Sequence, residues 1–144
     1  MGTRSLTRVF DGSDKAPLVT IYRQDDGYPS GMGADLGEFC DGLKITNGLQ
    51  PGRTANGAGC FAAQLVGSLK NGEPGGVYLM PAGTRDAGQD YEYTVRVGAA
   101  SVTIECFDVV FNYPNGYENA GKARRKKLFA GPAAEFHAWA KGQK

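Results

Sequence analysis

Apolar and polar residues alternate along YEYTVRVGAASVTIECF, residues 91–107, and this stretch decides the fold. Its two halves, residues 91–97 and 101–107, change face at every residue, as half-buried strands do. Residues 98–100, Gly-Ala-Ala, form the turn between them. Two adjacent strands joined by a short turn pair with each other. The stretch therefore predicts a β-hairpin inside an antiparallel sheet.

Three further segments favour strands around this hairpin. Residues 4–10 and 17–23 are rich in β-branched and aromatic residues, and the turn formers of residues 11–14 separate them. These two runs look like a second hairpin. Residues 77–80 form a short apolar run that ends at Pro81. The sequence thus predicts about five strands.

Three segments carry apolar residues at helical spacing. They are residues 33–43, residues 59–69, and a last helix that begins near Pro132 and frays after Lys141. The resulting order is ββααβββα, which predicts a single α+β domain over 1–144, with an antiparallel sheet and about three helices packed on one face. Residues 109–127 lack either periodicity and are interpreted as an irregular insertion.

The composition limits the classes of protein to which the chain can belong. The chain has 144 residues, of which 22 are glycine, about twice the ordinary share. No run approaches the roughly 18 apolar residues of a membrane span, and no apolar segment follows the first residues as in a signal peptide. The three cysteines form no C-x-x-C pair. We expect buried thiols and a cytoplasmic protein of a bacterial host.

Charge is divided unevenly along the chain. Residues 1–121 carry 9 Lys/Arg and 14 Asp/Glu, a net charge of −5, whereas residues 122–144 carry 7 and 1, a net charge of +6. The acidic body argues against binding of a DNA or RNA polymer. The basic run of residues 122–127 is interpreted as a solvated loop, with contact to phosphates or to an acidic partner as the alternative.

Few side chains suit catalysis. His137 is the single histidine, and we expect it on the surface rather than as a general base. The acidic residues follow no metal-ligand spacing, so neither a metal nor a cofactor is predicted. Residues 116–123 approach a phosphate-binding loop, but Ala123 stands where the magnesium ligand belongs. A dinucleotide-binding fingerprint is not met around Gly31 and Gly33.

Residues 22–33 join a strand to a helix and form the densest unusual stretch. A helix start of this kind offers free N–H groups to anions, and Arg23 can pair with a phosphate while Tyr22 or Tyr28 stacks on a base. The alternative interpretation is a tight turn and helix cap. In residues 83–88, Arg85 either clamps a phosphate or forms an ion pair with its neighbour Asp86.

A resemblance covers most of the chain. Its segments are Gly2-Thr3-Arg4-Ser5-Leu6-Thr7, Tyr22-Arg23-Gln24, Asp26-Gly27-Tyr28-Pro29-Ser30-Gly31, Gly33, Asn56-Gly57-Ala58-Gly59-Cys60, Ala62-Ala63-Gln64-Leu65, Gly75-Gly76-Val77-Tyr78-Leu79, Tyr91-Glu92-Tyr93 and Phe129-Ala130-Gly131. They resemble a widespread small family of bacteriophages and bacterial genomes. The resemblance implies a viral sponge protein, which sequesters the cyclic nucleotide signals of anti-phage immunity such as CBASS. It also implies a homo-oligomer with sites near subunit interfaces.

The sequence leaves three functional interpretations open. A sponge for a cyclic nucleotide, preferably a cyclic dinucleotide, requires cationic clamps, stacking rings and polar contacts but no catalytic group. Its predicted ligand-binding residues are Arg4, Tyr22, Arg23, Tyr28, Ser30, Gly31, Asn56, Gln64, Arg85 and Tyr91. An enzyme that degrades the nucleotide would use His137, Asp26 or Tyr28 as acid or base. An inhibitor that binds a host protein directly would use the acidic body.

Overall fold

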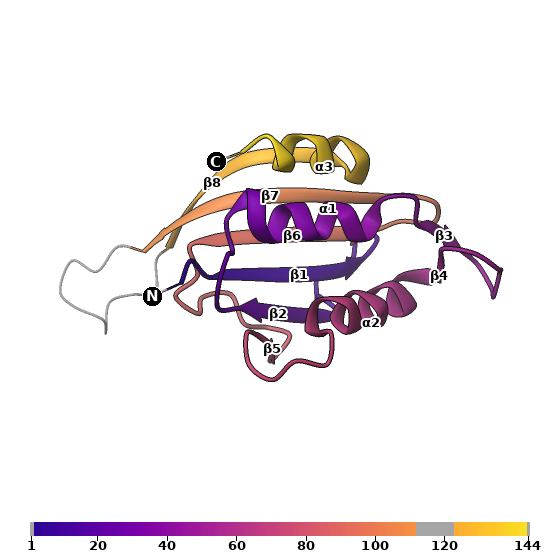
Figure 1. Ribbon diagram of the computed structural model, residues 1–144, viewed down its shortest axis with the longest axis horizontal. Coiled ribbons are helices and arrows are strands. Elements are labelled where there is room, and N and C mark those ends of the chain that lie inside the picture. The colour runs from indigo at the N-terminus through magenta and orange to yellow at the C-terminus, as the bar shows by residue number, and fades with distance from the viewer. Residues whose placement is uncertain (1, 112–122, 144) are drawn as a thin grey trace.

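The computed structural model describes residues 2–111 and 123–143 (Figure 1). Its elements are β1 (Ser5–Asp11), β2 (Val19–Arg23), a π-helix η1 (Pro29–Gly33), α1 (Ala34–Cys40), β3 (Lys44–Thr46), β4 (Thr54–Asn56), α2 (Gly57–Lys70), β5 (Val77–Met80), β6 (Tyr91–Val97), β7 (Val102–Phe111), β8 (Ala123–Pro132) and α3 (Ala133–Lys141). The predicted α+β class with three helices is confirmed among these residues. The predicted hairpins are β1–β2 and β6–β7, and both are antiparallel.

The main sheet is mixed, which corrects the prediction of a purely antiparallel sheet. Its order is β5-β2-β1-β6-β7-β8, and β1 and β6 run parallel, with Leu6 opposite Glu92. β5 adds to the free edge of β2 and has the same direction as β6. The chain must therefore return along the sheet before β6 begins. Residues 81–90 make this return, and Thr20 Oγ1 donates to the Ala82 carbonyl at 2.8 Å on the way.

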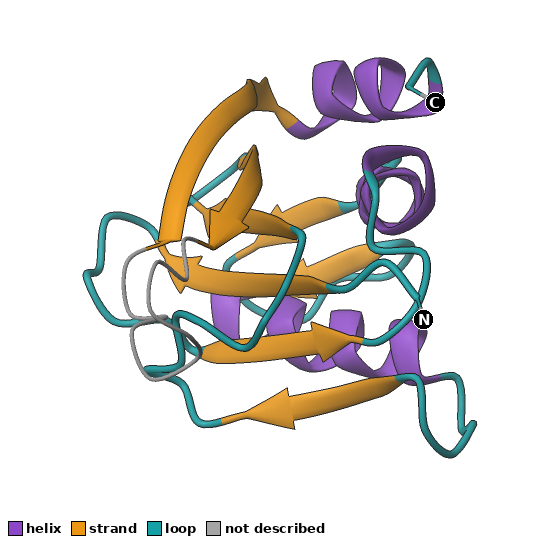
Figure 2. Ribbon diagram, turned by 90° about the vertical axis from the view of Figure 1, so that its left-hand side faces the viewer, coloured by secondary structure: helices purple, strands orange, loops and turns teal. Residues whose placement is uncertain are grey.

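The helices cover one face of this sheet (Figure 2). Alternation sends the strand residues Val9, Ile21 and Val95 toward the helices, where they join one buried cluster. α2 contributes Phe61 and Leu65 to that cluster, and both are fully buried. α1 packs mainly on α3 and η1, as the inter-element contacts show. The opposite face, called the outer face below, is the one that residues 81–90 cross.

Two regions in which the sequence predicted no helix or strand contain strands. Residues 44–58 include β3 and β4, which pair in parallel as a small second sheet. The predicted insertion at 109–127 is wrong at both ends, because β7 continues to Phe111 and β8 begins at Ala123. Residues 112–122, with most of the near phosphate-binding loop, lie outside the described residues. Residues 123–127 of the basic run thus belong to an edge strand rather than to a loop, and charged residues on an edge disfavour edge-to-edge strand pairing with other chains.

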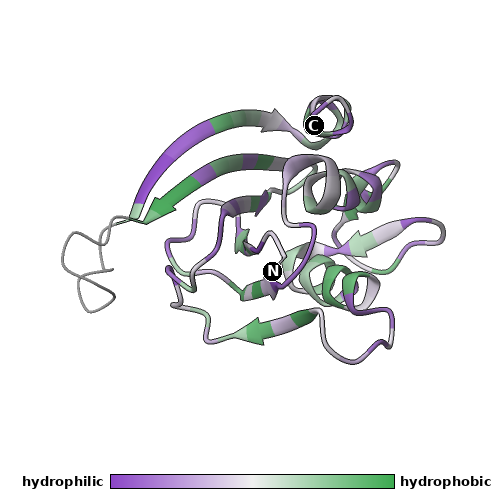
Figure 3. Cartoon of the chain, turned by 60° about the vertical axis from the view of Figure 1, so that its left-hand side comes forward, coloured by the Kyte–Doolittle hydropathy of each residue, from purple (hydrophilic) through white to green (hydrophobic). Residues whose placement is uncertain are grey.

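The β7–β8 hairpin arches away from the rest of the sheet (Figure 3). The first half of β8 appears purple in this view because it carries Arg124, Arg125, Lys126 and Lys127. A register shift between Cys106 and Phe107 marks the bend. No helix in the described part of the chain is long and apolar enough to cross a membrane.

Candidate functional site

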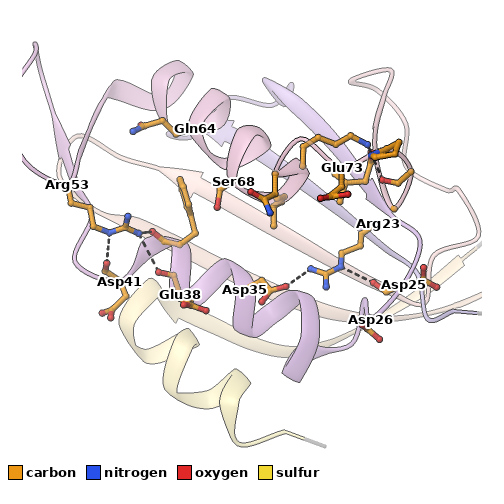
Figure 4. A pocket seen from close by; sticks show the side chains of 18 residues that line it. Arg23, Asp25, Asp26, Asp35, Glu38, Asp41, Arg53, Gln64, Ser68 and Glu73 are labelled. Carbon is orange, nitrogen blue, oxygen red and sulfur yellow. Dashed lines mark hydrogen bonds and ion pairs between the residues drawn. The ribbon is translucent and has the colours of Figure 1, made fainter.

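A polar groove of about 1060 Å³ opens between α1 and α2 (Figure 4). Its charged lining residues are Arg23, Asp25, Asp26, Asp35, Glu38, Asp41, Arg53, Lys70 and Glu73. Gln64 and Ser68 of α2 add neutral polar groups. The lining therefore contains six acidic side chains against three basic ones. This balance disfavours a phosphate ligand.

All three basic side chains of the groove are engaged by groups of the chain itself. Arg23 pairs with Asp35 at 2.6 Å and donates to the Asp25 carbonyl at 2.8 Å. Arg53 donates to the carbonyl groups at the end of α1 and just after it, including that of Asp41 at 2.9 Å. Lys70, at the end of α2, donates to the backbone carbonyls of Gly75 and Val77, just before and at the start of β5. These cations hold the groove walls together.

Five carboxylates of the groove have no ion pair within the described residues: Asp25, Asp26, Glu38, Asp41 and Glu73. Asp26 accepts a hydrogen bond from the Tyr28 hydroxyl at 3.1 Å, and this bond raises the pKa of Tyr28. The groove thus has a surplus of negative charge that faces solvent. Chemically, it suits a cationic group.

The turn at residues 26–33 is explained by contacts within the chain. The Gly27 N–H donates to the Thr3 carbonyl at 2.8 Å, and the buried Tyr93 hydroxyl donates to the Gly27 carbonyl at 2.8 Å. A side chain at Gly27 would approach the backbone of Arg4 within 2.6 Å. At Gly31 it would collide with the Asp26 carbonyl. These glycines let the turn pack closely, which agrees with the interpretation of this stretch as a tight turn rather than a binding site.

A cluster of arginines lies on the outer face. We call five arginines the arginine cluster: Arg4, which directly precedes β1, Arg8 of β1, Arg85 of the 81–90 crossing, Arg96 of β6 and Arg125 of β8. Glu92 and Asp86 are the acids that pair with it. Positive charges thus outnumber negative ones on this part of the outer face.

Glu92 holds the centre of the arginine cluster. Its side chain is 2% exposed, and it accepts hydrogen bonds from Arg125 at 3.1 and 3.2 Å. Arg125 also reaches Asp86 at 2.8 Å, and Arg85 lies 3.8 Å from Glu92. The fully buried amide of Gln89 donates to the Arg85 carbonyl. These bonds attach β8 and the 81–90 crossing to β6.

Arg8 forms no ion pair within the described residues. Its Nε atom is buried and has no hydrogen-bond partner among the described residues, and the same holds for Nε of Arg4. The Arg8 guanidinium lies over the Phe10 ring at 5.1 Å. Burial, reinforced by the nearby charge of Arg85, lowers the pKa of Arg8. An anion beside Arg8 would relieve this accumulation of positive charge.

The ten predicted ligand-binding residues do not form one site. Arg4, Tyr22 and Arg85 belong to the outer face. Arg23 and Gln64 line the groove on the other side of the sheet. The remaining five are Tyr28, Ser30 and Gly31 in the turn, Asn56, which accepts from the Gly48 N–H at 2.7 Å, and Tyr91, whose pKa is raised by burial.

The sequence interpretation missed Arg8, Arg96 and Arg125. The signal for Arg8 was available, because alternation in residues 4–10 places it on the same face as Arg4 and Leu6. Arg96 stands between the buried Val95 and Val97, so it also faces outward. Arg125 had no such signal, because the strand that contains it was not recognised.

The candidate catalytic groups lie apart from one another. His137 of α3 packs against Gly37 of α1, where a side chain at Gly37 would meet the imidazole within 2.6 Å. Asp26 lies at the groove and Asp86 is paired with Arg125. Within residues 2–111 and 123–143, no three His, Cys, Asp or Glu side chains gather as metal ligands. Trp139 stacks on Phe129 with ring centroids 5.2 Å apart, which makes it part of the core.

The three thiols are expected to differ in reactivity. Burial raises the pKa of Cys40 and of Cys106 from 9.0 to about 12, whereas Cys60 of α2 is only half-buried. At pH 8 a thiol reagent should modify Cys60 first, and all three in denaturant, because the thiolate is the reactive form. Mass spectrometry after timed labelling measures the order. Equal labelling rates in the native protein would contradict it.

The same shifts predict alkaline sensitivity. The folded state holds these two protons more tightly than the unfolded state. The contribution of the two thiols to stability is therefore complete below pH 9 and is lost as pH rises from 9 toward 12.

Comparison with known proteins adds nothing to the site: no family model, curated protein or solved structure matches the chain.

Proposed function

We propose that this protein binds and sequesters a cyclic nucleotide, preferably a cyclic dinucleotide, at the arginine cluster without cleaving it. The observation that carries the proposal is the excess of arginines over acids on the outer face, where Arg8 and Arg4 form no ion pair within the described residues. Guanidinium groups bind phosphate oxygens through paired, charge-assisted hydrogen bonds. A phosphate at this face would offer acceptors to the terminal nitrogens of the Arg8 guanidinium.

The same face offers rings for the bases. Tyr22 of β2 lies opposite Leu6 on one side and Tyr78 of β5 on the other. The two tyrosine rings are 6.2 Å apart, and Tyr78 is 49% exposed. Stacking on an aromatic ring contributes about 1–3 kcal/mol per base. Phosphate contacts at β1 and base contacts at β2 and β5 would then share one continuous surface.

Sequestration rather than cleavage is favoured by the chemistry of the neighbouring groups. Glu92 and Asp86 are committed to Arg125, so neither is a free general base. His137 lies on the helix side of the sheet, in contact with α1. A sponge needs affinity alone, whereas an enzyme must bind its transition state more tightly than its substrate.

The test is calorimetric titration and native mass spectrometry with a panel of cyclic di- and trinucleotides and cyclic ADP-ribose isomers. We expect binding, and recovery of intact ligand after heat release. Recovery of a cleaved product would replace the sponge with an enzyme. Absence of binding to every member of the panel would overturn the proposal.

Two arginine variants distinguish the outer face from the groove. Replacing Arg8 by alanine should weaken binding by about 1.5–3 kcal/mol, because one charge-assisted contact to phosphate is lost. Replacing Arg23 by alanine should leave the affinity unchanged, because Arg23 is engaged by Asp35 across the sheet. Both variants must first show a native melting transition. The opposite result, with only Arg23 required, would move the site to the groove.

A further inference from the structure

We infer that copies of this chain associate through opposite charges, with the basic start of β8 in one copy docking in the acidic groove between α1 and α2 of another. The inference is independent of nucleotide binding. It rests on three observations: a groove with unpaired carboxylates, an exposed strand with unpaired cations, and the separation of the two within a single copy.

The groove supplies the negative surface. Its volume of about 1060 Å³ is large enough to admit several side chains. Five of its carboxylates lack an ion pair within the described residues, and its three cations are bonded to the chain's own groups. Glu73 and Asp41 mark two of its borders and are both exposed. A ligand with an extended row of cations matches this charge.

β8 supplies the positive surface. Its side chains alternate, so Arg125 and Lys127 face outward and pair with Glu92 and Glu105. Arg124 and Lys126 point the other way, are exposed, and have no ion pair among the described residues. Val110, opposite Arg124, is 48% exposed and adds an apolar contact.

The two surfaces do not meet within one copy. None of the groove-lining residues belongs to β7 or β8. β8 forms one edge of the sheet, and its first half lies on the hairpin that arches away from the body (Figure 3). Isolated surface ion pairs contribute little, but Arg124 and Lys126 would enter a groove with five unpaired carboxylates, and such opposite charges act together and steer association. A second copy of this chain provides that match.

The experiment is analytical ultracentrifugation across a concentration series at about 50 mM and about 500 mM salt, where screening differs strongly. The arm variant combines Arg124→Glu with Lys126→Glu, and the groove variant combines Asp41→Lys with Glu73→Lys. We expect a dimer or larger assembly at low salt. The dissociation constant should be at least about tenfold higher at high salt and in each variant. Lys15→Glu with Lys141→Glu applies the charge change of the arm variant elsewhere on the surface and should leave association intact.

Mixing the two variants is the decisive step. The arm variant retains a native groove, and the groove variant retains a native arm, so their equimolar mixture should form a 1:1 dimer that neither forms alone. A wild-type protein that stays monomeric at low salt would overturn the inference, as would a mixture that stays monomeric. Both variants leave the arginine cluster intact, so unchanged nucleotide binding separates this outcome from the proposed function.

Discussion

Replacing Phe136 by alanine is expected to lower the free energy of unfolding by about 3–5 kcal/mol. The ring is completely buried and lies among Tyr93, Phe129 and Trp139, with centroids 6.2, 5.7 and 5.8 Å away. It also meets Gly33, where a side chain would come within 3.3 Å of the ring. Removing it leaves a cavity where α3, η1 and the sheet meet.

Urea denaturation followed by circular dichroism measures the loss. Leu79→Ala is the matched control, because Leu79 is a large apolar residue that is 60% exposed on the edge strand β5. Its effect should remain within about 0.5–1 kcal/mol. A Phe136→Ala variant as stable as the Leu79→Ala variant would show that α3 does not depend on this ring for its docking.

Replacing Glu92 by alanine is expected to cost about 3–5 kcal/mol of stability, the range for breaking a buried ion pair. Glu92 is 2% exposed, and Arg125, its main partner, is 20% exposed. The loss leaves Arg125 and the nearby Arg8 without the central counter-charge. It also frees the 81–90 crossing, since Gln89 lies 3.5 Å from the carboxylate.

Thermal unfolding in the presence of inorganic phosphate distinguishes charge from shape. Glu92→Gln retains the side-chain volume, so it should be less destabilising than Glu92→Ala. Added phosphate should stabilise both variants more than the wild type, because an anion at the arginine cluster replaces the missing carboxylate. Equal stabilisation of all three proteins would show that phosphate does not take the place of the missing carboxylate.

The local elements follow closely from the sequence. Alternation predicted residues 91–97 as a strand with the observed bounds, and the short apolar run before Pro81 predicted the strand at residues 77–80. The helical stripe near the C-terminus included Phe136 and Ala140, both completely buried. These signals are readable because each depends only on which side chains one face of an element must bury. The π-helix at residues 29–33 had no comparable signal.

The candidate site was less accessible to sequence reasoning. Arg4 and Arg85 lie on the outer face, whereas the sequence grouped them with Arg23, which lies across the sheet in the groove. Successive residues of a strand point to opposite faces of the sheet, so neighbouring positions such as Tyr22 and Arg23 diverge. The six acids of the groove come from separate segments, and no local spacing brings them together.

By itself the sequence determined the type of most elements, the residues that each buries, the single histidine and the division into an acidic body and a basic end. Only the tertiary structure decided that β1 and β6 run parallel and that residues 81–90 cross the outer face. It alone joined Arg8 with Arg85 and Arg125. Periodicity specifies the face that a side chain takes, whereas the order of the strands depends on long-range pairing that no local pattern encodes.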